Sequence, residues 1–191
     1  RLITPTAGAI RIGEVDIARL SERRLRPHRR NVQIVFQDPY RSLNPRRTVG
    51  ASIIEGPVNF GLSRPQALDR ARRLMTLVGL AQDVLDRYPH QFSGGQRQRI
   101  AIARALAMEP QVLIADEAVS ALDVSVQAQV LKLLDDIRRR FDLAVLFITH
   151  DLRVAAQICD RIAVMQQGVI VEQGVTADVF AAPQHPYTRA L

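Results

Sequence analysis

The sequence has a single cysteine, Cys159, and aromatic residues make up only 5% of its 191 positions. One cysteine excludes a disulfide within the chain and is typical of proteins from a reducing compartment. No apolar run reaches the roughly 18 residues that a membrane-spanning helix needs. Residues 1–5 lack the apolar stretch of a signal peptide. We therefore expect a soluble chain that could still dock on a membrane protein.

Positive charge is in excess: the sequence has 26 Lys and Arg residues and 19 Asp and Glu residues, which gives a net charge of +7. Lys132 is the only lysine. Such a surplus suits nucleic acid, anionic lipid head groups or a polyanionic nucleotide. No reading helix or ladder of aromatic residues accompanies it, so a nucleic-acid partner is not expected. We interpret the arginine-rich residues 19–30 as a solvated helix and loop.

Apolar runs alternate with helically spaced segments, which predicts an α/β fold whose mostly parallel sheet is flanked by helices. Strands are expected at residues 9–12, 31–36, 111–115, 143–148, 161–165 and 169–172. Helices are expected at residues 65–78, 96–108, 124–140 and 152–159, and from residue 176. Pro45, Gly56, Pro57, Gly61 and Pro65 are interpreted as breaks, after which residues 65–78 form an inserted helix.

Three predicted strands end in polar residues: Gln37, the pair Asp116 and Glu117, and His150. The carboxyl ends of parallel strands share one edge of a sheet, and ligands bind there. Each residue alone has an ordinary alternative, as a solvated acid, a hydrogen-bonding amide or a structural histidine. Together they offer a metal ligand, a general base and an imidazole that stabilises charge, which suits phosphoanhydride hydrolysis.

A second candidate site precedes the helix predicted at residues 96–108. Ser93, Gly94, Gly95 and Gln96 place two glycines before a helix start, where backbone N–H groups are unpaired and anions bind. The ordinary alternative is a glycine-rich helix cap without a ligand.

These motifs resemble those of the ATPase subunit of ABC transporters, and the resemblance covers essentially the whole chain. Residues 92–96 (FSGGQ) are similar to the signature motif, and residues 112–117 (VLIADE) to the Walker B strand. Gln37 matches the Q-loop, Asp123 the D-loop and His150 the switch histidine.

The resemblance implies ATP and Mg²⁺ as cofactors and gives each residue a role. Asp116 would hold Mg²⁺ through water, with Gln37 as a second metal ligand, and Glu117 would polarise the attacking water. Gln37 would also sense the γ-phosphate, which His150 would contact. Ser93, Gly94, Gly95, Gln96 and Asp123 would bind nucleotide at the contact with a partner.

The family also has a P-loop NTPase-like (RecA-like) sheet with an inserted helical subdomain. It implies an ATPase core at residues 1–43 and 108–175, a helical subdomain at 44–107 and a C-terminal helix and tail at 176–191. Residues 36–45 (FQDPYRSLNP) and 185–191 (HPYTRAL) resemble the oligopeptide and dipeptide importer branch, which also serves nickel and glutathione.

That branch implies a second ATPase subunit in a head-to-tail homo- or heterodimer, transmembrane permease subunits and, indirectly, a substrate-binding protein. It places the chain peripherally on the cytoplasmic face of the inner (plasma) membrane. Two alternatives remain: a non-transport ABC ATPase that works on DNA or ribosomes, and a truncated, non-catalytic remnant.

The sequence departs from the family at the phosphate loop, Gly-x-x-x-x-Gly-Lys-[Ser/Thr], because Lys132 has no glycine near it. We expect the chain to be the C-terminal portion of a subunit, and this portion to begin after the loop. Without the loop it should bind ATP weakly and be inactive alone, although its signature motif could still cap ATP on a partner.

Overall fold

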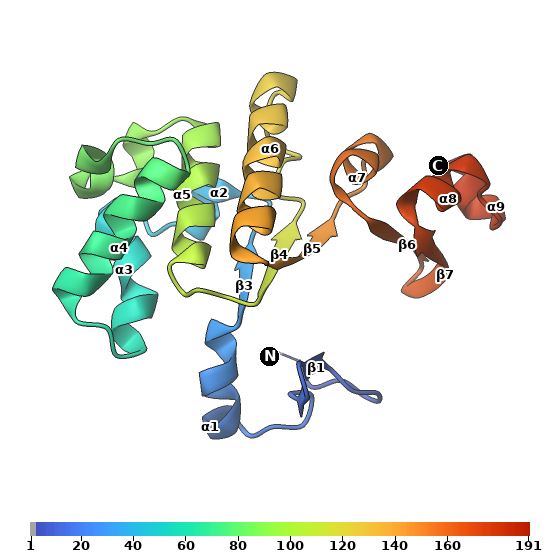
Figure 1. Ribbon diagram of the computed structural model, residues 1–191, viewed down its shortest axis with the longest axis horizontal. Helices are drawn as coiled ribbons and strands as arrows, with labels where there is room; N and C mark the ends of the chain where they lie inside the picture. The colour runs from blue at the N-terminus through green and yellow to red at the C-terminus, as the bar shows by residue number, and fades with distance from the viewer. Residues whose placement is uncertain (1–2) are drawn as a thin grey trace. The chain divides into compact units, whose positions relative to one another are not determined.

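The computed structural model describes residues 3–191, which form two compact units divided between Leu146 and Phe147 (Figure 1). The first unit contains a short antiparallel ribbon, three strands of a sheet and a group of helices. Its strands are β1 (Arg11–Ile12), β2 (Val15–Asp16), β3 (Val32–Val35), β4 (Val112–Asp116) and the start of β5 (Ala144–Ile148). Its helices are α1 (Glu22–Leu25), α2 (Pro39–Ser42), α3 (Val49–Asn59), α4 (Arg64–Leu77), α5 (Gly94–Leu106) and α6 (Val124–Phe141), with 3₁₀ turns at Arg26–Arg30, Gln82–Asp86 and Pro89–Gln91.

The sheet has the order β3-β4-β5, and β3 and β4 pair in parallel. Their register sets Val32 opposite Val112 and Val35 opposite Ala115. Val35, Leu113 and Ala115 are fully buried, because the apolar face of α5 packs against β3. This confirms the predicted α/β fold with a parallel sheet and flanking helices.

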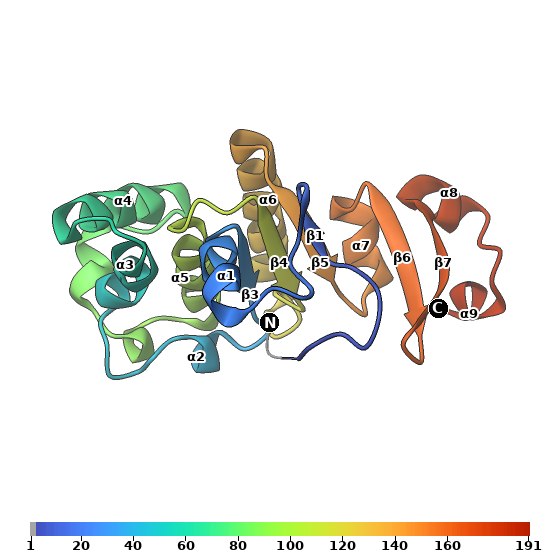
Figure 2. The same ribbon diagram turned by 90° about the horizontal axis from the view of Figure 1, so that it is seen from below.

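The helices and 3₁₀ turns from α2 to α5 all come from the single stretch of chain that connects β3 to β4. Figures 1 and 2 show α5 lying between α4 and the β3–β4 pair, with α3 beside α4. Helix α4 begins one residue before the predicted start, directly after Ser63, whose N–H donates to Gln66 Oε1 at 3.1 Å. It stops before Gly79, which adopts a φ of +71° that glycine accepts at little cost.

The predicted break at Gly56 and Pro57 is wrong, because both residues lie inside α3. Thr48 caps this helix by accepting the Ala51 N–H at 3.2 Å. Pro57 lies in the last turn of α3, where it removes one backbone hydrogen bond of the helix, the one to the Ile53 carbonyl. Gly56 packs closely against Met108, since a Cβ there would lie 2.5 Å from Met108 Sδ and that side chain would have to shift.

The second unit, Phe147–Leu191, contains α7 (Leu152–Ile158), the antiparallel hairpin of β6 (Arg161–Gln166) and β7 (Val169–Val175), α8 (Thr176–Ala181) and α9 (Pro186–Ala190). The hairpin turns at Gln167 and Gly168, whose φ values of 49° and 80° fit a two-residue turn with positive φ at both positions. The side chain of Glu172 anchors the following segment, because it accepts the N–H groups of Gln184 and His185 at 2.8 and 3.0 Å.

Candidate functional site

The structure brings Gln37 together with the turn that follows β4. Gln37 comes two residues after Val35, and Asp116 follows the paired Ala115, so both lie beyond the same end of the parallel pair. The Gln37 amide donates from Nε2 to Ser120 Oγ at 3.3 Å. The Ser120 hydroxyl in turn donates to the Glu117 carbonyl at 3.0 Å, so one hydroxyl joins the predicted glutamine to the predicted acidic pair.

Glu117 has a left-handed backbone, with φ of 47°. For a residue with a Cβ this conformation costs about 1–2 kcal/mol, and strained residues of this kind cluster at functional sites. The Ser120 N–H also donates to the Glu117 carbonyl, at 3.1 Å, so the turn that begins at Glu117 is held at its far end. Asp116 is half-buried at the last position of β4.

The predicted signature residues form the start of α5. Ser93 is the N-cap and accepts the Gln96 N–H at 3.3 Å, while Gln96 Oε1 accepts the Ser93 N–H at 3.0 Å. In this reciprocal capping box the Gln96 side chain is hydrogen-bonded to Ser93 of the same helix start. The remaining N–H groups of the first turn belong to Gly94 and Gly95, which are the groups able to meet an anion.

The two glycines differ in their surroundings. A Cβ on Gly94 would meet only Leu122 Cδ2, at 3.8 Å, which is an ordinary contact. A Cβ on Gly95 would lie 2.4 Å from Val126 Cγ1 in the first turn of α6. Gly95 therefore permits the close approach of α5 to α6, a packing role that the sequence did not reveal.

Asp123 is the N-cap of α6. Its carboxylate accepts the Val126 N–H at 3.0 Å and the Ser125 hydroxyl at 2.9 Å. The first of these hydrogen bonds, followed by the second, lowers the pKa of Asp123 below its usual value. The residue predicted to bind nucleotide thus has a clear structural role at the start of this helix.

His150 is exposed, in the loop between β5 and α7, and belongs to the second unit. The backbone around it is fixed by its neighbours, because the Asp151 N–H donates to Thr149 Oγ1 at 3.0 Å. Asp151 caps α7 and also binds the Arg153 guanidinium at 3.0 Å. The association of His150 with the strand ends of the first unit stays a prediction.

Asp116 and Gln37 provide one carboxylate and one amide oxygen, the hard donors that Mg²⁺ prefers. Among residues 3–191, no three His, Cys, Asp or Glu side chains gather in a way that could hold a metal ion. A site with so few protein ligands fits Mg²⁺, because this ion usually takes its other ligands from water and substrate phosphates. The donor set is therefore compatible with Mg²⁺ held together with a nucleotide.

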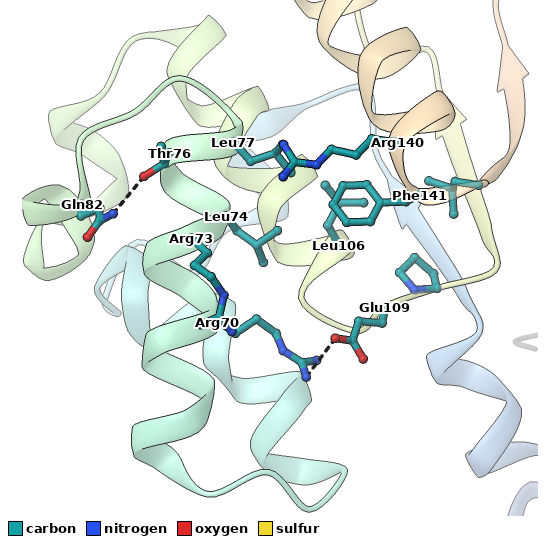
Figure 3. Close-up of a pocket in the computed structure, with 12 residues that line it drawn as sticks. Arg70, Arg73, Leu74, Thr76, Leu77, Gln82, Leu106, Glu109, Arg140 and Phe141 are labelled. Atoms are coloured by element: carbon teal, nitrogen blue, oxygen red, sulfur yellow. Dashed lines mark hydrogen bonds and ion pairs between the residues drawn. The ribbon is translucent and has the colours of Figure 1, made fainter.

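A cavity of about 830 Å³ lies elsewhere in the first unit (Figure 3). Pro110 and Leu143, which line it, precede β4 and β5, so the cavity is at the amino ends of these strands. Two of its cations are already paired, Arg70 with Glu109 at 3.0 Å and Arg73 with Asp69. The cavity is thus at the opposite end of β4 from Asp116 and takes no part in the candidate site.

Sequence reasoning missed three side chains of α5 that contact residues 36–42, on either side of Gln37. Gln98 donates from Nε2 to the Phe36 carbonyl at 3.4 Å, and Arg104 donates to the Ser42 carbonyl. The Arg97 guanidinium lies over the Tyr40 ring, 3.7 Å from its centroid. The only signal in the sequence was the run of polar residues directly after the signature motif, which gave no hint of their partners.

The chain is similar to known proteins along its whole length. Residues 1–120 match the family model described as ABC transporter. A Brucella ovis protein named as a peptide import ATP-binding protein is 53% identical over 192 residues, covering 100% of this chain and 61% of its own length. A glutathione import ATP-binding protein of Salmonella choleraesuis is also 53% identical, over 100% of this chain and 31% of its own.

Among solved structures, that of cbiO1 from Clostridium perfringens, part of the ABC transporter complex cbiONQ, superposes with a TM-score of 0.84. It is 31% identical and covers 94% of this chain and 70% of its own. The chain spans about three fifths or less of the length of the import proteins it matches. By the match over residues 1–120, the chain belongs to the ABC transporter family.

Proposed function

We propose that the chain is the ATP-hydrolysing part of an importer for peptides or for small solutes of the nickel or glutathione type. The observation that carries this is the hydrogen-bonded group of Gln37, Ser120 and Glu117 at the carboxyl end of the parallel strands. The import proteins that it resembles at 53% identity support the direction of transport and the class of solute.

We assign the chemistry to the acidic pair and to residues around it. Asp116 and Gln37 hold Mg²⁺, which when bound neutralises charge on the phosphates of ATP. Glu117 orients the attacking water and accepts its proton. Its left-handed backbone turns the chain sharply at the strand end, so that its carboxylate and that of Asp116 serve different partners. His150 stabilises negative charge on the terminal phosphate.

Ser93, Gly94, Gly95 and Gln96 are proposed to bind the phosphates of ATP on a second ATPase subunit in a head-to-tail dimer. The backbone N–H groups at the start of α5 support this, since they are preorganised by the capping box and need no rearrangement to meet an anion. Asp123 contributes by fixing the start of α6, on which Gly95 packs. Nucleic acid has no place in this scheme.

The remaining assignments follow the same family pattern. Residues 44–107 would act as a helical subdomain, residues 1–43 and 108–175 as the ATPase core and residues 176–191 as a C-terminal helix and tail. Within residues 3–191, no helix is both long and apolar enough to cross a membrane. We propose that the chain works peripherally on the cytoplasmic face of the inner membrane, bound to permease subunits that a substrate-binding protein supplies with solute.

Reconstitution tests this function. The gene product that carries these residues is assembled with its partner ATPase, permease subunits and binding protein in liposomes, and uptake of a labelled tripeptide and of labelled glutathione is measured. We expect ATP- and Mg²⁺-dependent uptake of one of them. ATP hydrolysis that responds to DNA or ribosomes, with no solute uptake, would instead favour a non-transport ATPase.

A further inference from the structure

The segment that follows Gln37 cannot hold its own shape. Its helix, α2, has only four residues, far fewer than an isolated helix needs. Asp38 caps it by accepting the Tyr40 N–H at 2.8 Å, but this bond is local. The position of the segment relative to the rest of the first unit must therefore come from contacts with other elements.

Three side chains of α5 make those contacts, one of them to the residue just before Gln37. Gln98 holds the backbone at Phe36, just before Gln37, and Arg104 holds it at Ser42, at the end of α2. Between them the Arg97 guanidinium covers the ring of Tyr40 at 3.7 Å. The segment is thus held on the helix that begins with the signature motif.

Arg97 is unusual because its charge is buried. The residue is only 7% exposed, and among the described residues it makes no ion pair with a carboxylate. Its guanidinium donates to the carbonyls of Pro89 and His90, at 2.7 and 3.4 Å. Tyr40 is 62% exposed, but the guanidinium against its ring is buried, and a desolvated cation gains more from an aromatic face than a solvated one.

The same guanidinium therefore joins three segments: the loop before the signature motif, the first turns of α5 and the segment after Gln37. Gln98 adds a second link and is fully buried, although its Oε1 has no hydrogen-bond partner. A buried amide that leaves one group unsatisfied is costly. The hydrogen bond from Nε2 to the Phe36 carbonyl offsets part of this cost.

We infer that Arg97, through Tyr40, and Gln98, through Phe36, are positioning residues that make Gln37 and the signature motif move as one body. The inference rests on the proposed function in one respect, which is that movement at Gln37 must reach the partner's nucleotide through Ser93–Gln96. Neither Arg97 nor Gln98 needs to touch nucleotide or solute. Loss of the Tyr40 ring would loosen the link between the two motifs without altering either of them, while the contacts of Gln98 and Arg104 remain.

The first test is hydrogen–deuterium exchange of the gene product without nucleotide, comparing Tyr40→Ala with Tyr40→Phe. We expect Tyr40→Ala to speed exchange about tenfold in residues 38–43 and in residues 89–93, with α4 unchanged. Tyr40→Phe keeps the ring and should exchange as the unmodified protein does. Arg41→Ala, at a neighbouring residue whose side chain is 92% exposed and makes only a 3.4 Å ion pair with Asp38, is the control for a general effect of substitution in α2. Unchanged exchange in Tyr40→Ala would overturn the inference.

The second test is the ATPase activity of the assembled transporter, with and without solute and binding protein. We expect Tyr40→Ala to lose most of the stimulation by solute while Tyr40→Phe retains it. Faster exchange with full stimulation would make the contact merely structural and would also overturn the inference. If the unmodified assembly neither hydrolyses ATP nor responds to solute, the proposed function fails, and the exchange result alone then decides whether the two segments are held together.

Discussion

Gln37 and Ser120 lie 83 positions apart in the sequence, yet the Gln37 amide donates to the Ser120 hydroxyl at 3.3 Å. Because that hydroxyl also donates to the Glu117 carbonyl at 3.0 Å, it joins the loop after β3 to the acidic pair after β4. The position of Gln37 is therefore linked to the backbone of the residue that we propose as the base.

Replacing Ser120 by Ala should weaken this link. The variant loses the acceptor of Gln37 and one donor to the Glu117 carbonyl, which still accepts the Ser120 N–H. We expect a destabilisation of about 1 kcal/mol and a fall in kcat of the assembled ATPase that exceeds any change in KM. Ser120→Thr keeps the hydroxyl and serves as the control. Equal kcat in Ser120→Ala and the unmodified protein would remove Ser120 from the site.

Substituting the two glycines of the signature motif one at a time should separate an effect on stability from an effect on activity. Gly95→Ala forces a methyl group against Val126 and should destabilise the first unit by about 1–3 kcal/mol, the usual cost of overpacking. Gly94→Ala meets only an ordinary contact and should be neutral in stability, measured by urea unfolding.

Both glycine substitutions should nevertheless lower ATP hydrolysis, because each adds a side chain where backbone N–H groups would meet a phosphate. The double variant Gly95→Ala with Val126→Ala relieves the clash and should regain stability but not activity. Full activity in Gly94→Ala would argue against nucleotide binding at this helix start.

Acid should weaken the start of α6 through Asp123. Its folded-state pKa is lowered, chiefly by the Val126 N–H, so the ionised cap stabilises the fold above the unfolded pKa of about 3.9. This stabilisation is lost as the pH falls through the lower folded pKa. The difference in unfolding free energy between the unmodified protein and Asp123→Ala should therefore begin to shrink below about pH 5 and go on shrinking below about pH 3.9. The difference between Asp123→Asn, which keeps a neutral cap, and Asp123→Ala should not change with pH, because neither side chain titrates; a difference independent of pH between the unmodified protein and Asp123→Ala would contradict the ionised cap.

The 191 residues by themselves should bind ATP weakly. None of them forms the glycine-rich loop with a lysine that cradles β- and γ-phosphates, and Lys132 lies within α6. We expect a Kd weaker than about 1 mM in a titration with a fluorescent ATP analogue. Micromolar affinity would show that other residues of the chain replace that loop.

The helices with a strong apolar stripe were predictable from the sequence. The ranges expected for α4, α5 and α6 differ from the structure by at most two residues at either end, because helical spacing of buried residues is a local signal. Helix α3 was missed for the opposite reason. Glycine at position 56 is typical of a break in a helix, and the close packing of Met108 against it cannot be recognised in the sequence.

The candidate site was predictable in its members but not in its connections. Gln37, Asp116 and Glu117 stand at strand ends, and the parallel register brings those ends together as expected. The contact of Gln98 with Phe36 joins positions 62 residues apart, and no periodicity in the sequence reports it. The capping role of Asp123 is a local pattern, an Asp directly before a helix, that the functional interpretation overlooked.

The measurement that tests the central claim most directly is single-turnover ATP hydrolysis by the assembled transporter, comparing Glu117→Gln with Glu109→Gln. The two glutamates flank β4 at opposite ends and share a left-handed backbone, with φ of 47° and 52°, so they are matched in local conformation. If Glu117 is the base, Glu117→Gln should hydrolyse ATP about 10²–10⁴-fold more slowly while still binding it, and Glu109→Gln should match the unmodified protein. Hydrolysis at the full rate in Glu117→Gln would contradict the account.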